Sequence, residues 1–244
     1  SRPMGRSIYI GSLVYDWCYD LMDNDVKEFF RNRMMRIARK MDPGWPPFEE
    51  SIINGHGNEA QINRDLLAMS IAVYNEDPEP YKFISYLVLE QLVPMRAFEY
   101  QSPRHNQGVD YGAYRFGWEM HAAWLFYRMS GQHVFDPNIR KVPYFWQYMK
   151  LPGGKMLRDG DRFNVRDTAE SYYWKQPFTA LLSYAYTSDP HLKAEFVAQG
   201  GLPNDPVLYV LLNDPSIEAG WNYDNVLLTQ DFGPSLGGLI FCTG

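Results

Sequence analysis

The sequence has too few cysteines for them to organise a fold. Cys18 and Cys242 lie near opposite ends of the 244 residues, a number and spacing that predict neither a disulfide framework nor a metal site. No apolar run reaches the ~18–20 residues of a membrane-spanning helix. Basic residues are also outnumbered, with 23 Lys and Arg against 29 Asp and Glu and a net charge of −6. We therefore expect no nucleic acid among the partners and no membrane span.

Aromatic residues, in contrast, are abundant, with 14 Phe, 18 Tyr and 7 Trp. With 45% hydrophobic residues, the chain is long enough and apolar enough to bury a substantial core. Strand-like alternation is confined to residues 226–229 and 237–242, around a turn at 232–234. Elsewhere the apolar residues recur at helical spacing, and Pro94 is expected to kink or end one of the predicted helices. These helices cover residues 5–21, 25–41, 57–74, 80–98, 109–129, 137–150, 166–186, 191–198 and 205–212. The fold class expected is all-α with a short β tail.

Three connections between the predicted helices are long. If the helices run up and down, these connections, residues 42–56, 99–108 and 151–165, fall at one end of the array. Long loops in compact domains usually carry function, so a cleft is predicted at that end. Loops that lengthened without functional cause are the alternative.

Two of these loops deliver groups suited to proton transfer. His56 and Glu59 lie three residues apart at the start of one helix, and Tyr111 and Arg115 lie four apart at the start of another. If the two helices run parallel, the four side chains converge, and together they suit chemistry beside an anionic substrate. Each also has a structural explanation: His56 as a helix cap, Glu59 as a partner of the helix dipole, and Tyr111 as a core residue.

Other polar groups have simpler interpretations. The remaining histidines show no metal-binding spacing and are predicted to be structural. The basic residues from Arg31 to Lys40 share a helix with Phe29 and Met35, which fits a solvated outer face or a helix lying on a membrane surface. The stretch from Arg158 to Arg162 contains Asp161 and fits either a turn or part of the predicted cleft.

At these residues the sequence resembles the heparinase II/III-like polysaccharide lyases, and within them heparinase II. The resemblance rests on residues 54–61 (NGHGNEAQ), 106–116 (NQGVDYGAYRF) and 227–244 (LLTQDFGPSLGGLIFCTG), with 14–22 (VYDWCYDLM) in addition. The family has a His-x-x-Glu pair followed some fifty-five positions later by a Tyr and, four residues on, an Arg. His56, Glu59, Tyr111 and Arg115 match this pattern in type and spacing.

The resemblance implies an incomplete (α/α) toroid of antiparallel helix pairs followed by a β-sandwich. The toroid would occupy residues 1–222, and residues 223–244 would be the first strands of the sandwich. The chain is therefore expected to be the catalytic toroid of a larger enzyme, or a fragment of one. A further catalytic histidine and a structural zinc would lie in the rest of the sandwich, with no cofactor or metal in this segment. A bacterial periplasmic or secreted location and assembly as a homodimer are compatible with the family.

The resemblance also implies β-elimination beside a uronic acid, with an acidic polysaccharide such as heparan sulfate or heparin as substrate. Protonated Glu59 would neutralise the uronate carboxylate. Tyr111 would donate a proton to the leaving O4 and could act as the base, His56 would be the base for the opposite C5 epimer, and Arg115 would favour the tyrosinate and hold the substrate. The expected substrate-binding residues are Asn54, Asn58, Arg104, Tyr114, Trp118, Arg158 and Asp161.

Two other functions compete with the lyase. An (α/α)-barrel glycoside hydrolase acting on uronyl oligosaccharides would use carboxylates such as Asp110 and Asp161 with a water molecule. A non-catalytic toroid would bind glycans on aromatic side chains such as Trp45, Tyr114 and Trp118. The reaction product distinguishes the two enzymes, because a lyase creates a C4–C5 double bond and this hydrolase consumes one.

Overall fold

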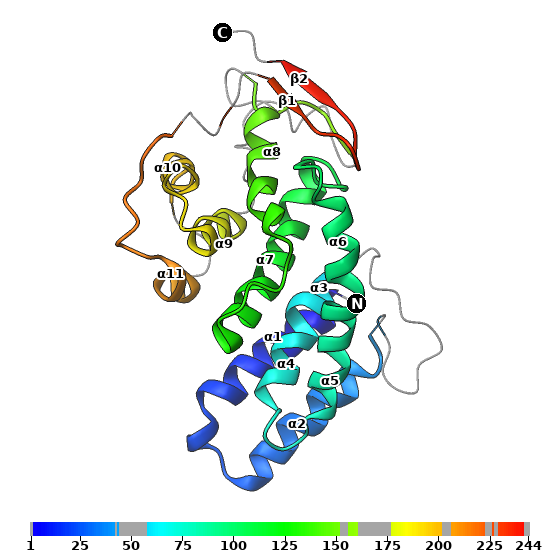
Figure 1. Cartoon of the computed structure of the whole chain (residues 1–244). Helices are drawn as coiled ribbons and strands as arrows, with labels where there is room; N and C mark the ends of the chain where they lie inside the picture. Colours follow the sequence, from blue (N-terminus) through cyan, green and yellow to red (C-terminus); the bar gives the residue numbers. More distant parts are fainter. Residues whose placement is uncertain are drawn as a thin grey trace. The chain divides into compact units, whose positions relative to one another are not determined.

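The structure, a computed structural model, describes residues 2–41, 43, 58–151, 156–160, 177–201, 206–222, 226 and 229–241. It is mostly helical (67%), as the sequence predicts. The chain divides into two compact units, Ser1–Pro94 and Met95–Gly244, called here the first and second units (Figure 1). Among the described helices, none combines the length and the apolar character needed to span a bilayer. The predicted domain boundary between residues 222 and 223 stays a prediction.

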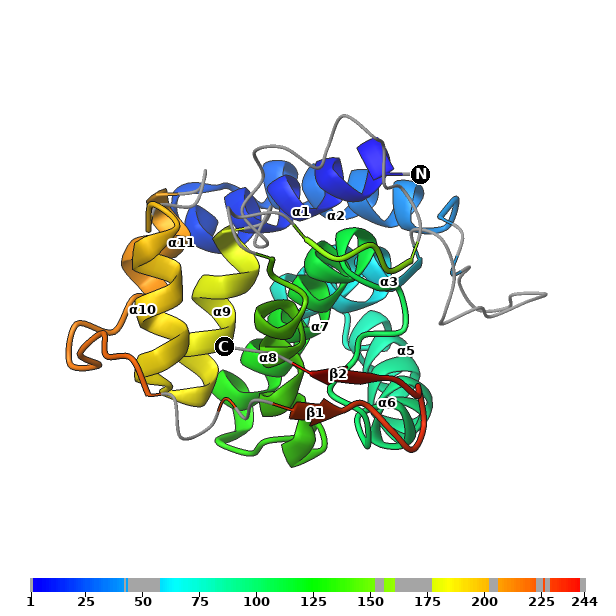
Figure 2. The same cartoon turned by 90° about the horizontal axis from the view of Figure 1, so that it is seen from above.

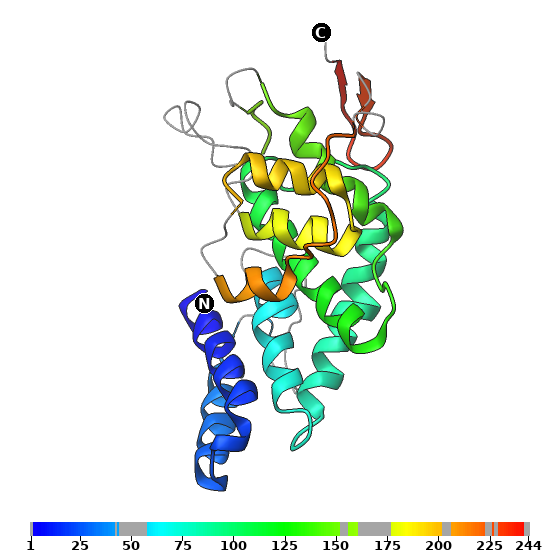
Figure 3. The ribbon, with the colours of Figure 1, turned by 90° about the vertical axis from the view of Figure 1, so that its left-hand side faces the viewer.

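The first unit begins with a helical hairpin, α1 (Arg2–Trp17) and α2 (Asn24–Ala38), which lie side by side in Figures 1 and 3. A short 3₁₀ turn, Tyr19–Leu21, leads from one helix to the next. Asp23 caps α2 by accepting a hydrogen bond from the Val26 N–H at 2.8 Å, as its position before the helix predicts. Buried Ser12 of α1 lies against Met34 of α2, so the contact between the helices includes a hydroxyl and a thioether.

The other two helical stretches of the first unit contain π-helical segments. The first stretch is α3 (Asn58–Ala60), a π segment at Gln61–Leu66 and α4 (Leu67–Ala72). The second is α5 (Glu79–Tyr86), a π segment at Leu87–Leu92 and α6 (Val93–Glu99), whose end lies in the second unit. Their positions confirm the predicted helices at 57–74 and 80–98.

Pro94 neither ends the helix nor breaks it, because the π segment directly before it accommodates the ring. Proline has no N–H to donate, and its ring clashes with the carbonyl four residues back. The wider π geometry directly N-terminal to Pro94 relieves that clash, and α6 continues through the proline.

The second unit is built around α7 (Asp110–Ser130), whose buried residues face several directions. Helix α9 (Pro177–Thr187) packs on it, and the Thr179 hydroxyl donates to the Ala113 carbonyl at 2.8 Å. Helix α10 (Pro190–Ala198) lies beside α9 in Figures 2 and 3. The unit also contains a 3₁₀ helix at Pro137–Lys141, α8 (Val142–Tyr148) and α11 (Pro206–Leu212). The predicted helix at 166–186 is described from residue 177 onward.

The β tail is present as an antiparallel hairpin of β1 (Thr229–Asp231) and β2 (Leu239–Phe241), with Gln230 opposite Ile240. The second strand lies within the predicted strand at 237–242, and the first contains Thr229 of the predicted strand at 226–229 and continues to Asp231. Residues 227 and 228 lie outside the described residues. Phe232, just after β1, is buried and meets the ring of Phe145 in α8 at 5.5 Å between centroids. The hairpin is therefore fixed to the helices by an aromatic side chain from its own turn.

Candidate functional site

The first turns of α7 form an aromatic row beside an arginine. Tyr111 meets Tyr114 edge to face at 5.6 Å between ring centroids, and Tyr114 meets Trp118 at 5.2 Å. The Arg115 guanidinium carbon lies 5.5 Å from the Tyr111 ring centroid, within the range of a cation–π contact. Arg115 is 4% exposed, whereas the three aromatic residues are half-buried. The spacing of three and four residues thus places these side chains together, as predicted.

Two of the long loops meet at this end of α7. The Val109 N–H donates to the Asp159 carbonyl at 2.9 Å, directly before the helix begins. Gly108 (φ +68°) and Gly160 (φ +81°) both adopt left-handed backbone conformations, and each lies against the backbone of the other's loop. A side chain at either glycine would collide with that backbone, so the contact depends on their having none.

We expect Gly108→Ala to destabilise the protein more than Gly131→Ala. Both glycines have φ near +70°, so alanine suffers comparable backbone strain of ~1–2 kcal/mol at each. At Gly131, the residue after α7, the added methyl group meets nothing, whereas at Gly108 it meets the Asp159 backbone. Gly108→Ala should therefore lower the free energy of unfolding by ~1–3 kcal/mol more than Gly131→Ala does, as measured by urea unfolding. Equal losses in the two variants would show that the loop contact contributes little.

Arg104 joins these two loops to the β hairpin. Its guanidinium makes two hydrogen bonds to the Asp159 carboxylate, at 2.8 and 2.6 Å, and a third to the Leu236 carbonyl at 3.2 Å. The bond to Asp159 raises the pKa of Arg104. This set of partners is structural, and contact with substrate stays a prediction for Arg104. Arg158, next to Asp159, is exposed.

A buried charged cluster that the sequence did not reveal lies where α6, the following loop and α7 meet. Arg96 donates to Glu119 at 2.8 Å and also pairs with Glu99, while the Tyr100 hydroxyl donates to Glu119. Arg96 and Glu119 are 1% and 0% exposed. The available signal was Glu119 itself, a carboxylate in the predicted helix at 109–129, just before an apolar run at residues 122–127.

His105 completes this cluster from the loop before α7. It is 3% exposed, its Nδ1 accepts from the Gln107 N–H at 3.2 Å, and its Nε2 lies 4.0 Å from a Glu119 oxygen. Burial, together with the charges of Arg96, Arg115 and Arg104, lowers the pKa of His105 well below its usual value. His105 is therefore neutral near pH 7 and structural, as predicted.

We expect His105 to make the protein less stable in mild acid. Below pH ~6.5 this histidine binds a proton in the unfolded chain but not in the folded one, so unfolding becomes easier. The free energy of unfolding should therefore fall by up to ~1.4 kcal/mol for each pH unit below that value. His105→Gln keeps an acceptor for the Gln107 N–H. In this variant the free energy of unfolding, measured with urea, should change less with pH between about 6.5 and 5. If the free energy of unfolding changes equally with pH in both proteins, His105 is not the cause of the acid sensitivity.

In the first unit, Glu59 opens a run of buried polar residues. Glu59 is 0% exposed, and Asn58 before it is buried as well. Along the π segment that follows, Gln61, Asn63 and Asp65 are also buried. The Asn63 amide has no hydrogen-bond partner in the described part of the chain. Buried polar groups on a π-helical segment are common at functional sites, which makes this the first unit's part of the candidate site.

The predicted catalytic residues belong to different parts of the chain. Glu59 lies in the first unit, while Tyr111 and Arg115 lie in the second, and each unit is described by itself. Convergence of all four therefore stays a prediction. The positions that lie outside the described residues are His56, Asn54, Trp45 and Asp161.

The second unit also has a groove that the sequence did not predict. Its volume is about 540 Å³, and Tyr144, Tyr148, Arg140 and Lys141 lie along one side of it. The Tyr144 hydroxyl donates at 2.6 Å to Asp189, which also lines the groove. Because Asp189 and Asp231 balance the two cations, the aromatic rings fit a sugar without a net preference for an acidic one.

Within the described residues, no three His, Cys, Asp or Glu side chains gather in a way that could hold a metal ion. No protein-family model matches the chain, and the search of curated proteins found no match either.

Proposed function

We propose that this protein is a polysaccharide lyase that cleaves a uronic-acid-containing glycosaminoglycan, such as heparan sulfate, by β-elimination. The observation that carries the proposal is the pairing of Tyr111 with Arg115 inside the aromatic row at the start of α7. A phenol provides the proton-transfer group, and the neighbouring guanidinium supplies a positive charge for an anionic substrate. Tyr114 and Trp118 supply flat apolar faces of the kind that bind sugar rings.

The reaction needs a base, an acid and neutralisation of the uronate. A base removes the proton at C5, the electron pair forms the C4–C5 double bond, and the C4–O4 bond breaks. The departing O4 takes a proton from Tyr111. Glu59 in its protonated form would hydrogen-bond the uronate carboxylate, which makes the C5 proton acidic enough to leave.

The choice of base depends on the epimer at C5. Tyr111 serves one epimer as both base and acid, and His56 takes the proton from the opposite face of the other. Because the chain carries a net charge of −6, it does not attract a polyanion as a whole. Recognition of the substrate must therefore rely on local cations such as Arg115 and Arg158.

The proposal extends to the architecture and the setting of the enzyme. The helices would belong to an incomplete (α/α) toroid, and the β1–β2 hairpin would open a β-sandwich domain, where a structural zinc would bind. Degradation of an external polysaccharide fits a periplasmic or secreted bacterial enzyme.

A non-catalytic glycan-binding protein is the second candidate, and the groove beside α8 favours it. Tyr144 and Tyr148 line this groove together with charged residues of both signs, which suits capture of a sugar without chemistry.

The experiment is to incubate the full-length protein with heparan sulfate, heparin and alginate and to follow the ultraviolet absorbance of unsaturated uronate. A rise in absorbance with shortening of the chains supports the lyase. Binding of intact chains without cleavage would replace it with the glycan-binding function, and consumption of pre-formed unsaturated ends would indicate a hydrolase.

A further inference from the structure

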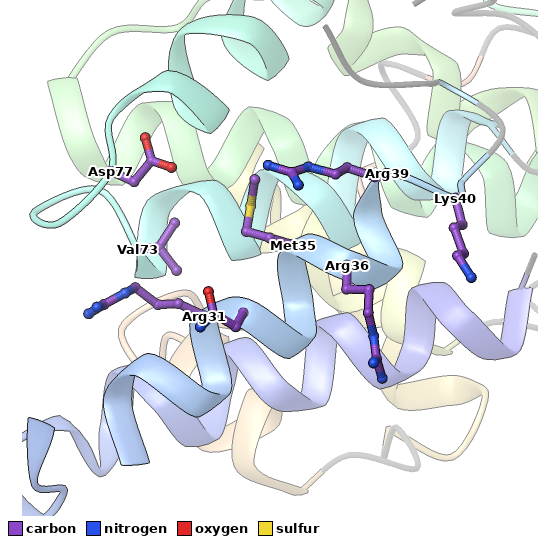
Figure 4. Close-up of a pocket in the computed structure, with 8 residues that line it drawn as sticks. Arg31, Met35, Arg36, Arg39, Lys40, Val73 and Asp77 are labelled. Atoms are coloured by element: carbon purple, nitrogen blue, oxygen red, sulfur yellow. The ribbon is translucent and has the colours of Figure 1, made fainter. Parts of the chain in front are cut away.

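A second groove, wholly within the first unit, lies between α2 and the C-terminal end of α4. Its volume is about 620 Å³, in the range of ligand-binding clefts. Arg31, Asn32, Met35, Arg36, Arg39 and Lys40 line it from α2 and the residues just after, and Val73 and Asp77 line the other wall. In Figure 4 the cations extend from Arg31, near the middle of α2, to Lys40, just after its end.

Three of the four cations have no carboxylate partner in the described part of the chain. Arg36, Arg39 and Lys40 are exposed and form no ion pair there. Arg31 differs, because its guanidinium donates to the Tyr15 hydroxyl at 3.2 Å and lies 3.8 Å from a Glu76 oxygen. Asp77 is the acidic residue of the lining, and it accepts from the Glu79 N–H at 3.2 Å. The groove is thus strongly cationic toward the Lys40 end.

We propose that this groove binds sulfate or carboxylate groups of an acidic saccharide chain, outside the residues that perform the elimination. The proposal rests on the proposed function for the identity of the saccharide. Four helical steps of 1.5 Å separate Arg36 from Lys40, or ~6 Å, and Arg31 extends the row to ~13 Å. A row of this length fits a ligand with several anionic groups better than a single free ion.

The remaining lining favours a saccharide over a nucleic acid. Met35 and Val73 provide an apolar floor that fits the C–H faces of sugar rings. No aromatic side chain lines the groove within the described residues, so stacking platforms for bases are missing there. Arg36 and Arg39 can each offer two N–H groups to a sulfate or carboxylate.

Cations near the end of α2 also stabilise the helix through its dipole, and this effect alone would need no ligand. The two explanations predict different effects when these cations are substituted. A helix-stabilising role predicts a lower melting temperature with unchanged binding, whereas a ligand site predicts weaker binding.

The test measures binding of a fluorescent heparan sulfate octasaccharide to the full-length protein in a Tyr111→Phe background, so that the ligand is not cut. The variant is Arg36→Gln/Arg39→Gln, and the control is Arg33→Gln/Arg128→Gln, which removes two arginines that are also exposed but do not line the groove. We expect the groove variant to raise Kd about tenfold or more, and the control to change it less than about twofold. Circular dichroism melts establish that both variants fold.

Equal Kd values in the two variants would overturn the groove site, as would tighter binding of a DNA duplex of matched charge. The cleavage assay tests the proposed function separately from the binding assay, because it uses protein in which Tyr111 is unchanged. Cleavage without any effect of the groove variant on binding would refute the groove alone. Octasaccharide binding that depends on the groove, without cleavage, would keep the groove and refute the lyase.

Discussion

Replacing Tyr111 with Phe is expected to lower the rate of unsaturated-uronate formation by ~10²–10⁴-fold, the usual contribution of a positioned acid or base. The substitution removes the hydroxyl and keeps the ring, so the contact with Arg115 and the edge-to-face contact with Tyr114 both remain. The loss can then be attributed to proton transfer. Steady-state kcat/KM on heparan sulfate, followed by ultraviolet absorbance, measures it.

A matched control is Tyr127→Phe, which removes a hydroxyl from the other end of the same helix. Tyr127 stacks on His133 with ring centroids 4.5 Å apart, and the phenylalanine ring preserves that contact. Its kcat/KM should stay within about threefold of the unsubstituted protein, well short of the change expected for a catalytic group. If Tyr111→Phe is as active as Tyr127→Phe, Tyr111 does not transfer the proton.

Replacing Arg96 with Met is expected to destabilise the second unit by ~3–5 kcal/mol. The substitution leaves the Glu119 carboxylate fully buried without the cation that balances it. Burial already raises the pKa of Glu119, against the opposing influence of Arg96, and the variant loses that influence. Equilibrium urea unfolding measures the loss.

The double variant Arg96→Met/Glu119→Leu separates the ion pair from general packing. Removing both charges should recover much of the stability lost in Arg96→Met, because no uncompensated charge remains in the interior. If the double variant is instead as unstable as the sum of the two single changes, the cluster stabilises the fold by packing and not by charge balance.

Local features of the structure follow from the sequence. The helices, the Asp23 cap and the β hairpin are set by residues close together in the chain, and the structure confirms the predicted helical character. The contact between Tyr111 and Arg115 was equally predictable, because one turn of helix determines it. Pro94 was recognised as a disturbance, but its outcome, a π segment before an unbroken helix, depends on packing that periodicity does not report.

The tertiary contacts could not be predicted in the same way. Arg96 and Glu119 are 23 residues apart, and Arg104 and Asp159 are 55 apart, so no spacing rule brings them together. Arg104 is an example: the sequence predicts it as a substrate ligand, which stays a prediction, and the structure adds hydrogen bonds from its guanidinium to a carboxylate and a carbonyl that no spacing indicates. The same limit applies to the predicted convergence of Glu59 with Tyr111, which stays a prediction because the two residues lie in different units.

The bonds of the β hairpin to the loop before α7 have a further consequence for local motion. Ser235 donates to the Glu99 carbonyl at 2.8 Å, and Arg104 donates to the Leu236 carbonyl, so the hairpin turn is joined to both ends of residues 99–104. Neither the hairpin turn nor residues 99–104 can move away without breaking these two hydrogen bonds. We therefore expect the hairpin and this loop to open together. The stability of the loop that leads to Tyr111 then depends on a turn more than a hundred positions later in the chain.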